Sequence, residues 1–210
     1  MPETQTLLLF AAASLALIAV PGPSVLYIVT RSVAQGRRAG LVSMLGIETG
    51  ALVHVTAAAV GVSALVASSA TAFTVLKYAG AAYLVFLGVR KLLERPEAAQ
   101  DAARRTHRRL FWEGALVNAL NPKTATFFLA FLPQFVDPGR GPVVLQVLAL
   151  GLLFVLVAIA SDGLWALVAG TASRRRRSIG SSRALARVSG GVYLSLGAAA
   201  ALAEGRPARR

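Results

Sequence analysis

Long apolar runs separated by short polar stretches dominate the sequence. A helix needs roughly 20 apolar residues to cross the hydrocarbon core of a bilayer. Six runs come close to this length or exceed it, and we interpret them as six transmembrane helices: Leu7–Val29, Leu41–Ala67, Phe73–Val89, Gly114–Val136, Val143–Ala172 and Val188–Ala203. The segment before the first run holds Glu3 and no Lys or Arg, so it lacks the positive leading region of a signal peptide and predicts an uncleaved span.

The composition supports this interpretation. Hydrophobic residues make up 56% of the 210 residues and charged residues only 15%, whereas a typical soluble domain is about a quarter charged. The chain therefore has too few polar residues to cover a soluble surface. It has no cysteine, which excludes disulfides and thiolate metal sites. The prediction is an all-α integral membrane protein, and no cofactor is expected.

The basic residues predict an orientation. The net charge of +13 is typical of nucleic-acid-binding proteins, but 16 of the 22 Lys and Arg residues lie in the connections after the first, third and fifth spans. Five lie on the opposite side, and Lys123 lies inside a span. Because cytoplasmic loops are rich in Lys and Arg, both termini are predicted to lie outside. The run Arg174–Arg177 is then better explained as charge that sets the membrane orientation and contacts anionic lipid. Nucleic acid is not an expected partner.

The two halves of the chain resemble each other. The third span contains Ala79–Gly88 and the sixth Ser189–Gly197, each with a Gly three residues before a Tyr-Leu pair. The first and fourth spans both contain proline near their middle. Each half, residues 1–105 and 106–210, has three predicted spans, and an odd number turns the second copy upside down. The sequence therefore predicts two inverted three-helix repeats, a pattern found in secondary transporters.

The proline-containing segments are candidates for a binding site. The first span holds Pro21, Gly22, Pro23 and Ser24, and the fourth holds Asn121, Pro122 and Lys123. Proline removes a backbone hydrogen bond, and such breaks survive in lipid only where they face protein or a water-filled cavity. A half-helix that starts at such a break directs N–H groups and a positive dipole end into the membrane interior, where a carboxylate can bind. The alternative is a kink that only improves packing.

Four ionisable residues lie at membrane depth: Glu48, His54, Lys123 and Asp162. Such residues usually mark ion or substrate pathways. Glu48 and Asp162 lie in the second and fifth spans, which are partners under the repeat. The alternative is a structural ion pair of Lys123 with one of the carboxylates. His54 is interpreted as a polar core residue.

Pairs of glycines four residues apart occur in and before the second span. Gly46 and Gly50 predict close approach of a second helix backbone. Gly36 and Gly40 are predicted to lie in a loop.

Several segments resemble the LysE/RhtB family of amino-acid exporters. They are Pro21-Gly22-Pro23, Asn121-Pro122-Lys123, the segment from Phe127 to Phe135 (FFLAFLPQF), and Gly80–Gly88. The resemblance covers essentially the whole chain. It implies a homodimer in the bacterial inner membrane that exports amino acids at the expense of the proton gradient. Asp162 before Trp165 matches the family's acidic residue in the fifth span, whereas Glu48 departs from the homoserine/threonine branch.

The predicted pathway for substrate and protons combines the two breaks with the buried carboxylates. It comprises Pro21, Gly22, Pro23, Ser24, Glu48, Asn118, Asn121, Pro122, Lys123 and Asp162. Asp162 is expected to couple export to protons, and Glu48 to tune affinity or cation preference. The expected partners are an amino acid, protons, the lipid bilayer and a second copy of the chain.

Other functional classes fit the sequence less well. A six-span metal-ion exporter is the first alternative, but two His, two Met and no Cys disfavour a soft-metal site. An intramembrane enzyme would need a dyad such as Ser24 and His54, yet no G-x-S-x-G surrounds Ser24. A scaffold or sensor would need a soluble signalling domain, and the sequence shows none. ATP-driven transport would need a phosphate-binding motif G-x-x-x-x-G-K-[ST], which the sequence does not contain.

The orientation can be tested with reporter fusions. Fusions after Arg105 and after Arg177 should report the cytoplasm, and fusions at Ser69, Gly139 and the C-terminus should report the outside, because basic loops stay in the cytoplasm. A cytoplasmic C-terminus would contradict both the six-span count and the inverted repeat, since the number of spans would then be odd.

Overall fold

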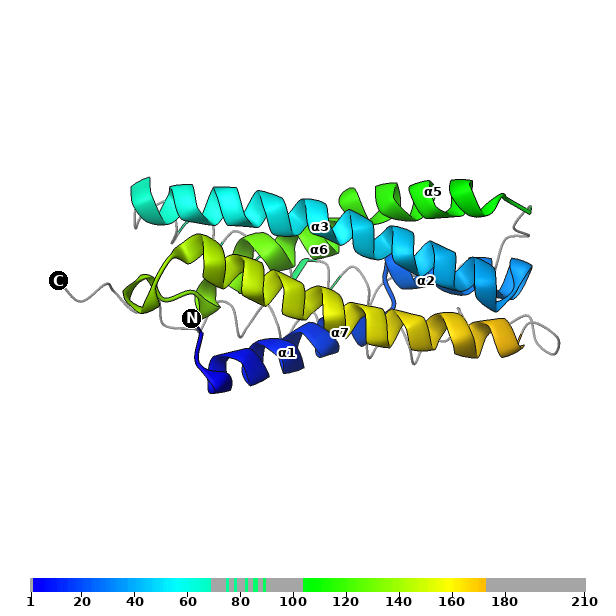
Figure 1. Ribbon diagram of the computed structural model, residues 1–210, viewed down its shortest axis with the longest axis horizontal. Helices are drawn as coiled ribbons and strands as arrows, with labels where there is room; N and C mark the ends of the chain where they lie inside the picture. The colour runs from blue at the N-terminus through cyan, green and yellow to red at the C-terminus, as the bar shows by residue number, and fades with distance from the viewer. Residues whose placement is uncertain are drawn as a thin grey trace.

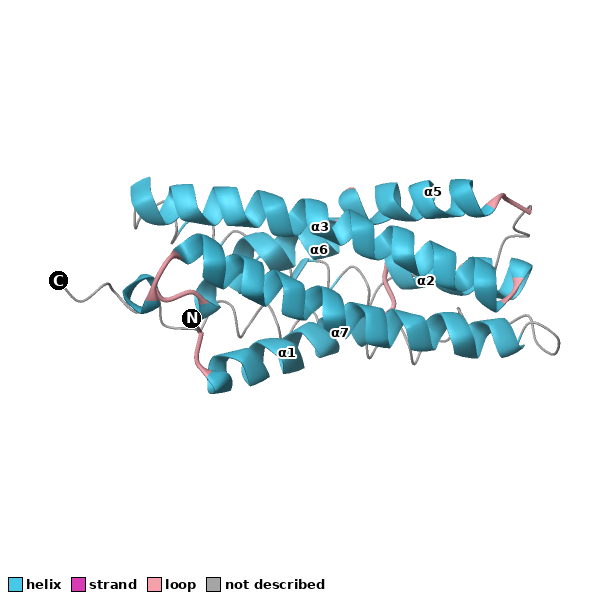
Figure 2. Ribbon diagram, in the orientation of Figure 1, coloured by secondary structure: helices cyan, strands magenta, loops and turns pink. Residues whose placement is uncertain are grey.

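The computed structural model describes residues 2–68 and 104–172, together with positions 75, 78, 82, 85, 86 and 89. All regular structure in this part of the chain is helical (Figure 2). The prediction of an all-α protein is confirmed there. The predicted sixth span, most of the third, and Arg174–Arg177 lie outside the described residues.

Two continuous helices are long and apolar enough to cross a membrane. Helix α3 (Arg37–Ser68) and helix α7 (Val143–Ala172) confirm the predicted second and fifth spans. α3 begins at Arg37, four residues before the predicted span, because Gly36 with a φ of 88° ends the preceding helix and the chain then continues directly as helix. A positive φ of this kind is readily adopted by glycine.

The predicted first span is broken, as its prolines indicated. Helix α1 (Thr4–Ala19) and helix α2 (Pro23–Gln35) meet at 55°, and together they are long and apolar enough to form one broken span. The extended backbone of Val20 separates them. Proline suits the first turn of a helix because it has no N–H to leave unpaired, so Pro23 starts α2.

The predicted fourth span is broken as well. Helix α5 (His107–Ala119) ends just before Asn121, and helix α6 (Pro122–Thr126) begins at the proline. The chain continues as the π-helical turn η1 (Phe127–Phe131) and the 3₁₀ turns η2 (Leu132–Phe135) and η3 (Pro138–Arg140). Pro133 cannot donate a backbone hydrogen bond, which accounts for irregular winding around it. α5 starts seven residues before the predicted span because the Thr106 side chain caps it.

The broken segments run in opposite directions beside the long helices (Figure 1). α3 packs along both α5 and α7, while α2 contacts α3, α5 and α7. The Gln35 side chain at the end of α2 bonds to the backbone of Arg105 just before α5, so these two segments share one end of the bundle. Antiparallel α1–α2 and α5–α6 agree with an inverted repeat. The six-span repeat and the division at residue 105 stay predictions.

Charge separates the two ends of the described bundle. One end holds the arginines in the last turns of α2, in the first turn of α3, and just before and in the first turn of α5: Arg31, Arg37, Arg38, Arg104, Arg105, Arg108 and Arg109. At the other end, Arg140 forms ion pairs with Glu3 and Asp137. Between the ends, large apolar side chains of α7 such as Leu145, Leu152 and Leu156 are more than half exposed. Such a pattern is typical of helices in lipid, and the chain is a multi-pass membrane protein.

Glycines set the distance between α3 and α5. A Cβ built on Gly46 would collide with the carbonyl of Phe111, and one on Gly50 with the carbonyl of Ala115. From the other side, a Cβ on Gly114 would lie 2.7 Å from the carbonyl oxygen of Ser43. The predicted close approach at Gly46 and Gly50 is confirmed.

The prediction for the neighbouring glycine pair was wrong for one member. Gly36 does lie in the turn, but Gly40 lies within α3, where an added Cβ would collide with the Ser32 hydroxyl of α2. The pattern of apolar residues did not predict that the helix begins as early as Arg37. Gly40 therefore allows α2 and α3 to pack closely beside the turn that joins them.

We expect Gly46→Ala to destabilise the protein and Gly61→Ala to leave it unchanged or slightly more stable. Alanine is the better helix former by about 1 kcal/mol, but at Gly46 its methyl group meets a backbone carbonyl, and such overpacking costs about 1–3 kcal/mol. At Gly61 no atom of the described chain lies within 4 Å of the new Cβ. Thermal unfolding of both variants in detergent checks this, and equal melting temperatures would contradict it.

Candidate functional site

The two breaks contact each other through Lys123. The ammonium Nζ of Lys123, in the first turn of α6, donates a hydrogen bond of 2.7 Å to the carbonyl of Val20, the last residue before the first break. The Lys123 side chain is buried with 7% exposure. An ion pair with a carboxylate was the sequence-based alternative for Lys123, and the same ammonium does interact electrostatically with Asp162. One buried cation thus joins the first half of the chain to the second.

Asn118 organises the polar side chains around this contact. Its Oδ1 accepts hydrogen bonds from Thr124 Oγ1 (2.9 Å), Ser24 Oγ (3.3 Å) and Asn121 Nδ2 (3.4 Å). Its Nδ2 donates to the carbonyl of Ile47 in α3 at 2.8 Å. A further bond of 2.9 Å runs from Asn121 Nδ2 to Ser24 Oγ. These bonds fix both breaks relative to α3.

The starts of the two half-helices differ. The Asn121 side chain caps α6, since its Oδ1 accepts a 3.0 Å hydrogen bond from the backbone N–H of Lys123. α2 begins after Gly22, and no side chain of the described residues caps it. The first N–H groups of a helix have no partner within the helix and carry its positive dipole end. The start of α2 therefore has no side-chain cap, as an anion-binding helix end requires, whereas the start of α6 is capped.

Seven of the ten predicted pathway residues line one cavity of about 30 Å³. They are Gly22, Ser24, Glu48, Asn118, Asn121, Lys123 and Asp162. The three prolines, Pro21, Pro23 and Pro122, lie in the breaks that adjoin it. The remaining wall is Thr124 and a set of apolar side chains: Leu17, Ile18, Val25, Ile47, Phe154 and Ala158. Residues from both halves of the chain thus meet at one point inside the helix bundle.

The cavity is small in this conformation. A volume of about 30 Å³ holds one or two water molecules, whereas pockets that bind small molecules usually measure roughly 300–1,000 Å³. Any substrate larger than water therefore requires the helices around the cavity to move apart.

Two carboxyl groups reach the cavity from opposite helices. Glu48 of α3 is 4% exposed and Asp162 of α7 is 3% exposed. Neither oxygen of Glu48, nor Oδ1 of Asp162, accepts a hydrogen bond from the residues that the structure describes. The two groups are close enough to repel each other electrostatically. Buried carboxylates are normally paired or hydrogen-bonded, so these groups are typical of a site that binds a cation or a proton.

Sequence reasoning missed Thr124 as a contributor to the site and predicted no partner for His54. Thr124 supplies a hydroxyl to Asn118, and His54 Nε2 lies 2.8 Å from the Asn118 carbonyl, to which it donates. Since a carbonyl is only an acceptor, His54 carries its proton on Nε2. The imidazole ring of His54 also stacks on the Phe128 ring, with 6.3 Å between the ring centroids. The interpretation of His54 as a polar structural residue agrees with these contacts, and the dyad with Ser24 is not formed, because both side chains bond to Asn118 instead.

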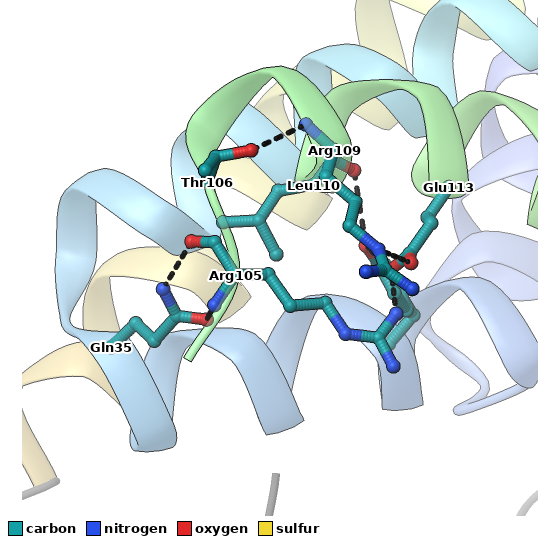
Figure 3. Close-up of polar contacts among 7 residues, drawn as sticks. Gln35, Arg105, Thr106, Arg109, Leu110 and Glu113 are labelled. Carbon is teal, nitrogen blue, oxygen red and sulfur yellow. Dashed lines mark hydrogen bonds and ion pairs between the residues drawn. The ribbon is translucent and has the colours of Figure 1, made fainter. Parts of the chain in front are cut away.

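A second polar cluster lies at the arginine-rich end of the bundle (Figure 3). Glu113 of α5 forms ion pairs with Arg105 and Arg109 and accepts a 3.2 Å hydrogen bond from the Tyr27 hydroxyl of α2. Gln35, also on α2, bonds twice to the backbone of Arg105. Sequence patterns could not pair the α2 residues with this segment, because Gln35 lies 70 positions from Arg105 and Tyr27 lies 86 positions from Glu113. The cluster fastens α2 to the start of α5 at this end of the described bundle.

The sequence matches a known protein family over most of its length. The family model for the LysE type translocator matches residues 15–204. The chain belongs to this family. The resemblance noted from the sequence motifs is therefore confirmed.

Several proteins have sequences similar to this chain. An uncharacterized membrane protein of Vibrio cholerae is 36% identical over 71% of this chain and 74% of its own length. A homoserine/homoserine lactone efflux protein of Salmonella typhimurium is 32% identical over 85% of this chain and 87% of its own. A leucine efflux protein of Salmonella choleraesuis is 29% identical over 58% of each chain. No solved structure matches.

We expect Lys123→Met to destabilise this LysE-type translocator by about 3–5 kcal/mol, because Asp162 would become a buried charge with less compensation and the Val20 carbonyl would lose its partner. Adding Asp162→Asn to Lys123→Met should restore part of the stability. A double-mutant cycle of thermal unfolding in detergent measures this coupling. Strictly additive effects of the two substitutions would show that Lys123 does not stabilise the Asp162 carboxylate.

Proposed function

We propose that this protein exports amino acids across the cytoplasmic membrane in exchange for protons. The observation that carries the proposal is the shared cavity, in which a cation, two carboxyl groups and an uncapped helix start lie together. The names of the relatives support it, since two of them are efflux proteins for homoserine or leucine. The substrate and proton pathway comprises the residues predicted from the sequence.

The cavity offers a partner for each end of an amino acid. The N–H groups of Ser24 and Val25 in the first turn of α2 suit the substrate carboxylate. Glu48 and Asp162 suit its ammonium group. The apolar wall around Leu17, Ile18 and Phe154 suits a small neutral side chain and gives a second charge no partner. We therefore propose neutral amino acids as the substrate class.

Proton entry supplies enough energy for such export. One elementary charge that crosses 100 mV releases about 2.3 kcal/mol, and a tenfold concentration gradient costs about 1.4 kcal/mol. One proton per zwitterion therefore sustains a gradient of roughly 50-fold. The cycle requires the cavity to widen and to open to each side in turn. In the proposed orientation the arginine-rich end faces the cytoplasm, so the Glu113 cluster of Figure 3 joins α2 to α5 on the cytoplasmic side.

The proposed assembly is a homodimer of six-span subunits in the bacterial inner membrane, with both termini outside. The alternatives draw no support from the described part of the chain. A metal-ion exporter would need a ligand cluster, and no three His, Cys, Asp or Glu side chains come together there. An intramembrane enzyme would need a nucleophile with a base, and the Ser24 hydroxyl contacts amides only.

Reconstituted protein tests the function. Proteoliposomes loaded with labelled L-homoserine or L-leucine should release it faster when an external proton excess drives protons inward. The Pro21→Ala/Pro23→Ala variant should lose this efflux, since alanine allows α1 and α2 to join and removes the uncapped helix start. Pro138→Ala in η3, which lies outside the cavity, is the control and should export normally. Efflux of neither amino acid, or efflux indifferent to pH, would contradict the proposal.

A further inference from the structure

Glu48 lies on the part of α3 that packs tightly against α5. It sits between Gly46 and Gly50, whose missing side chains bring α3 against the backbone of α5. The adjacent carbonyl of Ile47 accepts the hydrogen bond from Asn118. The carboxyl group is thereby fixed in place on the cavity wall, yet neither of its oxygens accepts a hydrogen bond from the residues that the structure describes. The fold positions Glu48 firmly and leaves its oxygens available.

The charges around Glu48 do not balance when all groups are ionised. Among the residues that the structure describes, the ionisable side chains that line the cavity with it are Lys123 from α6 and Asp162 from α7. The described parts of α1, α2 and α5 contribute no ionisable side chain to this lining, and His54 on α3 is directed to the Asn118 carbonyl. Two carboxylates against one ammonium leave one excess negative charge. A buried charge without compensation costs several kcal/mol, so the empty cavity requires one added positive charge.

Lys123 distinguishes the two carboxyl groups. Its ammonium attracts the carboxylate of Asp162, whereas Glu48 faces the like charge of Asp162. Lys123 thus stabilises the charged form of Asp162 in part, and the positive charge that the cavity requires belongs at Glu48. The motif resemblance pointed to Asp162 as the coupling residue, and the arrangement in the cavity favours Glu48 instead.

We propose that Glu48 is the group for which the proton and the ammonium group of the substrate compete. This inference rests on the proposed function and names the residue that couples its two fluxes. In the empty cavity the Glu48 carboxyl group carries the proton. When an amino acid binds, the O–H bond of Glu48 breaks, the proton leaves to water, and the substrate ammonium donates to the carboxylate in its place. The substrate carboxylate binds at the start of α2, which compensates its charge.

The competition has two consequences. Proton and amino acid cannot occupy Glu48 together, so each transport cycle exchanges one for the other. The site also requires a free ammonium group, because an N-acetylated amino acid has no positive charge to replace the proton. Glu48 therefore selects the substrate class and sets the exchange ratio at roughly one proton per amino acid.

Proton release on binding tests the inference directly. Purified full-length protein in weakly buffered detergent solution is titrated with L-homoserine and with L-leucine while a pH indicator follows protons. The unmodified protein should release about one proton per amino acid bound, and its affinity should rise up to about tenfold per pH unit. Glu48→Gln should release none and bind with an affinity that pH does not change. N-acetyl-L-leucine should neither bind nor release protons.

Pro138→Ala in η3, outside the cavity, is the control and should still release a proton on binding. Thermal unfolding shows whether each variant is folded, and Glu48→Asp, which keeps a carboxyl group, should release a proton even if Glu48→Gln fails to fold. Proton release by folded Glu48→Gln would overturn the assignment. Absence of release from an unmodified protein that exports amino acids would overturn the competition and leave the proposed function intact. Absence of both binding and efflux would refute the two together.

Discussion

The hydrogen bond from Lys123 to the Val20 carbonyl is the contact on which the site depends. Val20 ends α1 in an extended conformation, and its carbonyl lies within the bundle where water is scarce. A backbone carbonyl without a partner costs several kcal/mol in such surroundings. Lys123 removes this cost from the other half of the chain and is itself held at the break by the Asn121 cap. Each break therefore stabilises the other.

The remaining polar contacts follow from this arrangement. Once the breaks meet, Ser24, Asn121 and Thr124 all lie within reach of the Asn118 side chain, whose amide binds to α3. The glycines of α3 allow this approach, because a side chain at Gly46 or Gly50 would separate α3 from α5. Glu48 between these glycines is then held on the cavity wall. Close packing and buried charge thus depend on each other, because the small residues bring the helices close enough for the polar side chains to form their contacts.

The small cavity and the Glu113 cluster belong to one state of the proposed transport cycle. Room for one or two waters is sufficient for protons but not for an amino acid. The cluster holds α2 to α5 through ion pairs that are partly exposed, and such pairs contribute little stability. The Lys123 and Asn118 contacts are buried and break less readily. Opening is therefore easier at the arginine-rich end than at the breaks, which suits a fixed binding point with movable access.

The sequence by itself determined the elements. The apolar runs predicted α3 and α7 almost to the residue, and the prolines predicted both breaks, because length in lipid and the missing proline N–H are local constraints. It also placed Glu48, Lys123 and Asp162 at membrane depth. Only the tertiary structure decided that Lys123 bonds to a carbonyl, that Asn118 joins the breaks, and that Asn121 caps α6 while the start of α2 has no side-chain cap. The Lys123 bond and the Asn118 contacts join residues about 70 to 100 positions apart, and local pattern carries no information on which distant partner a polar group meets.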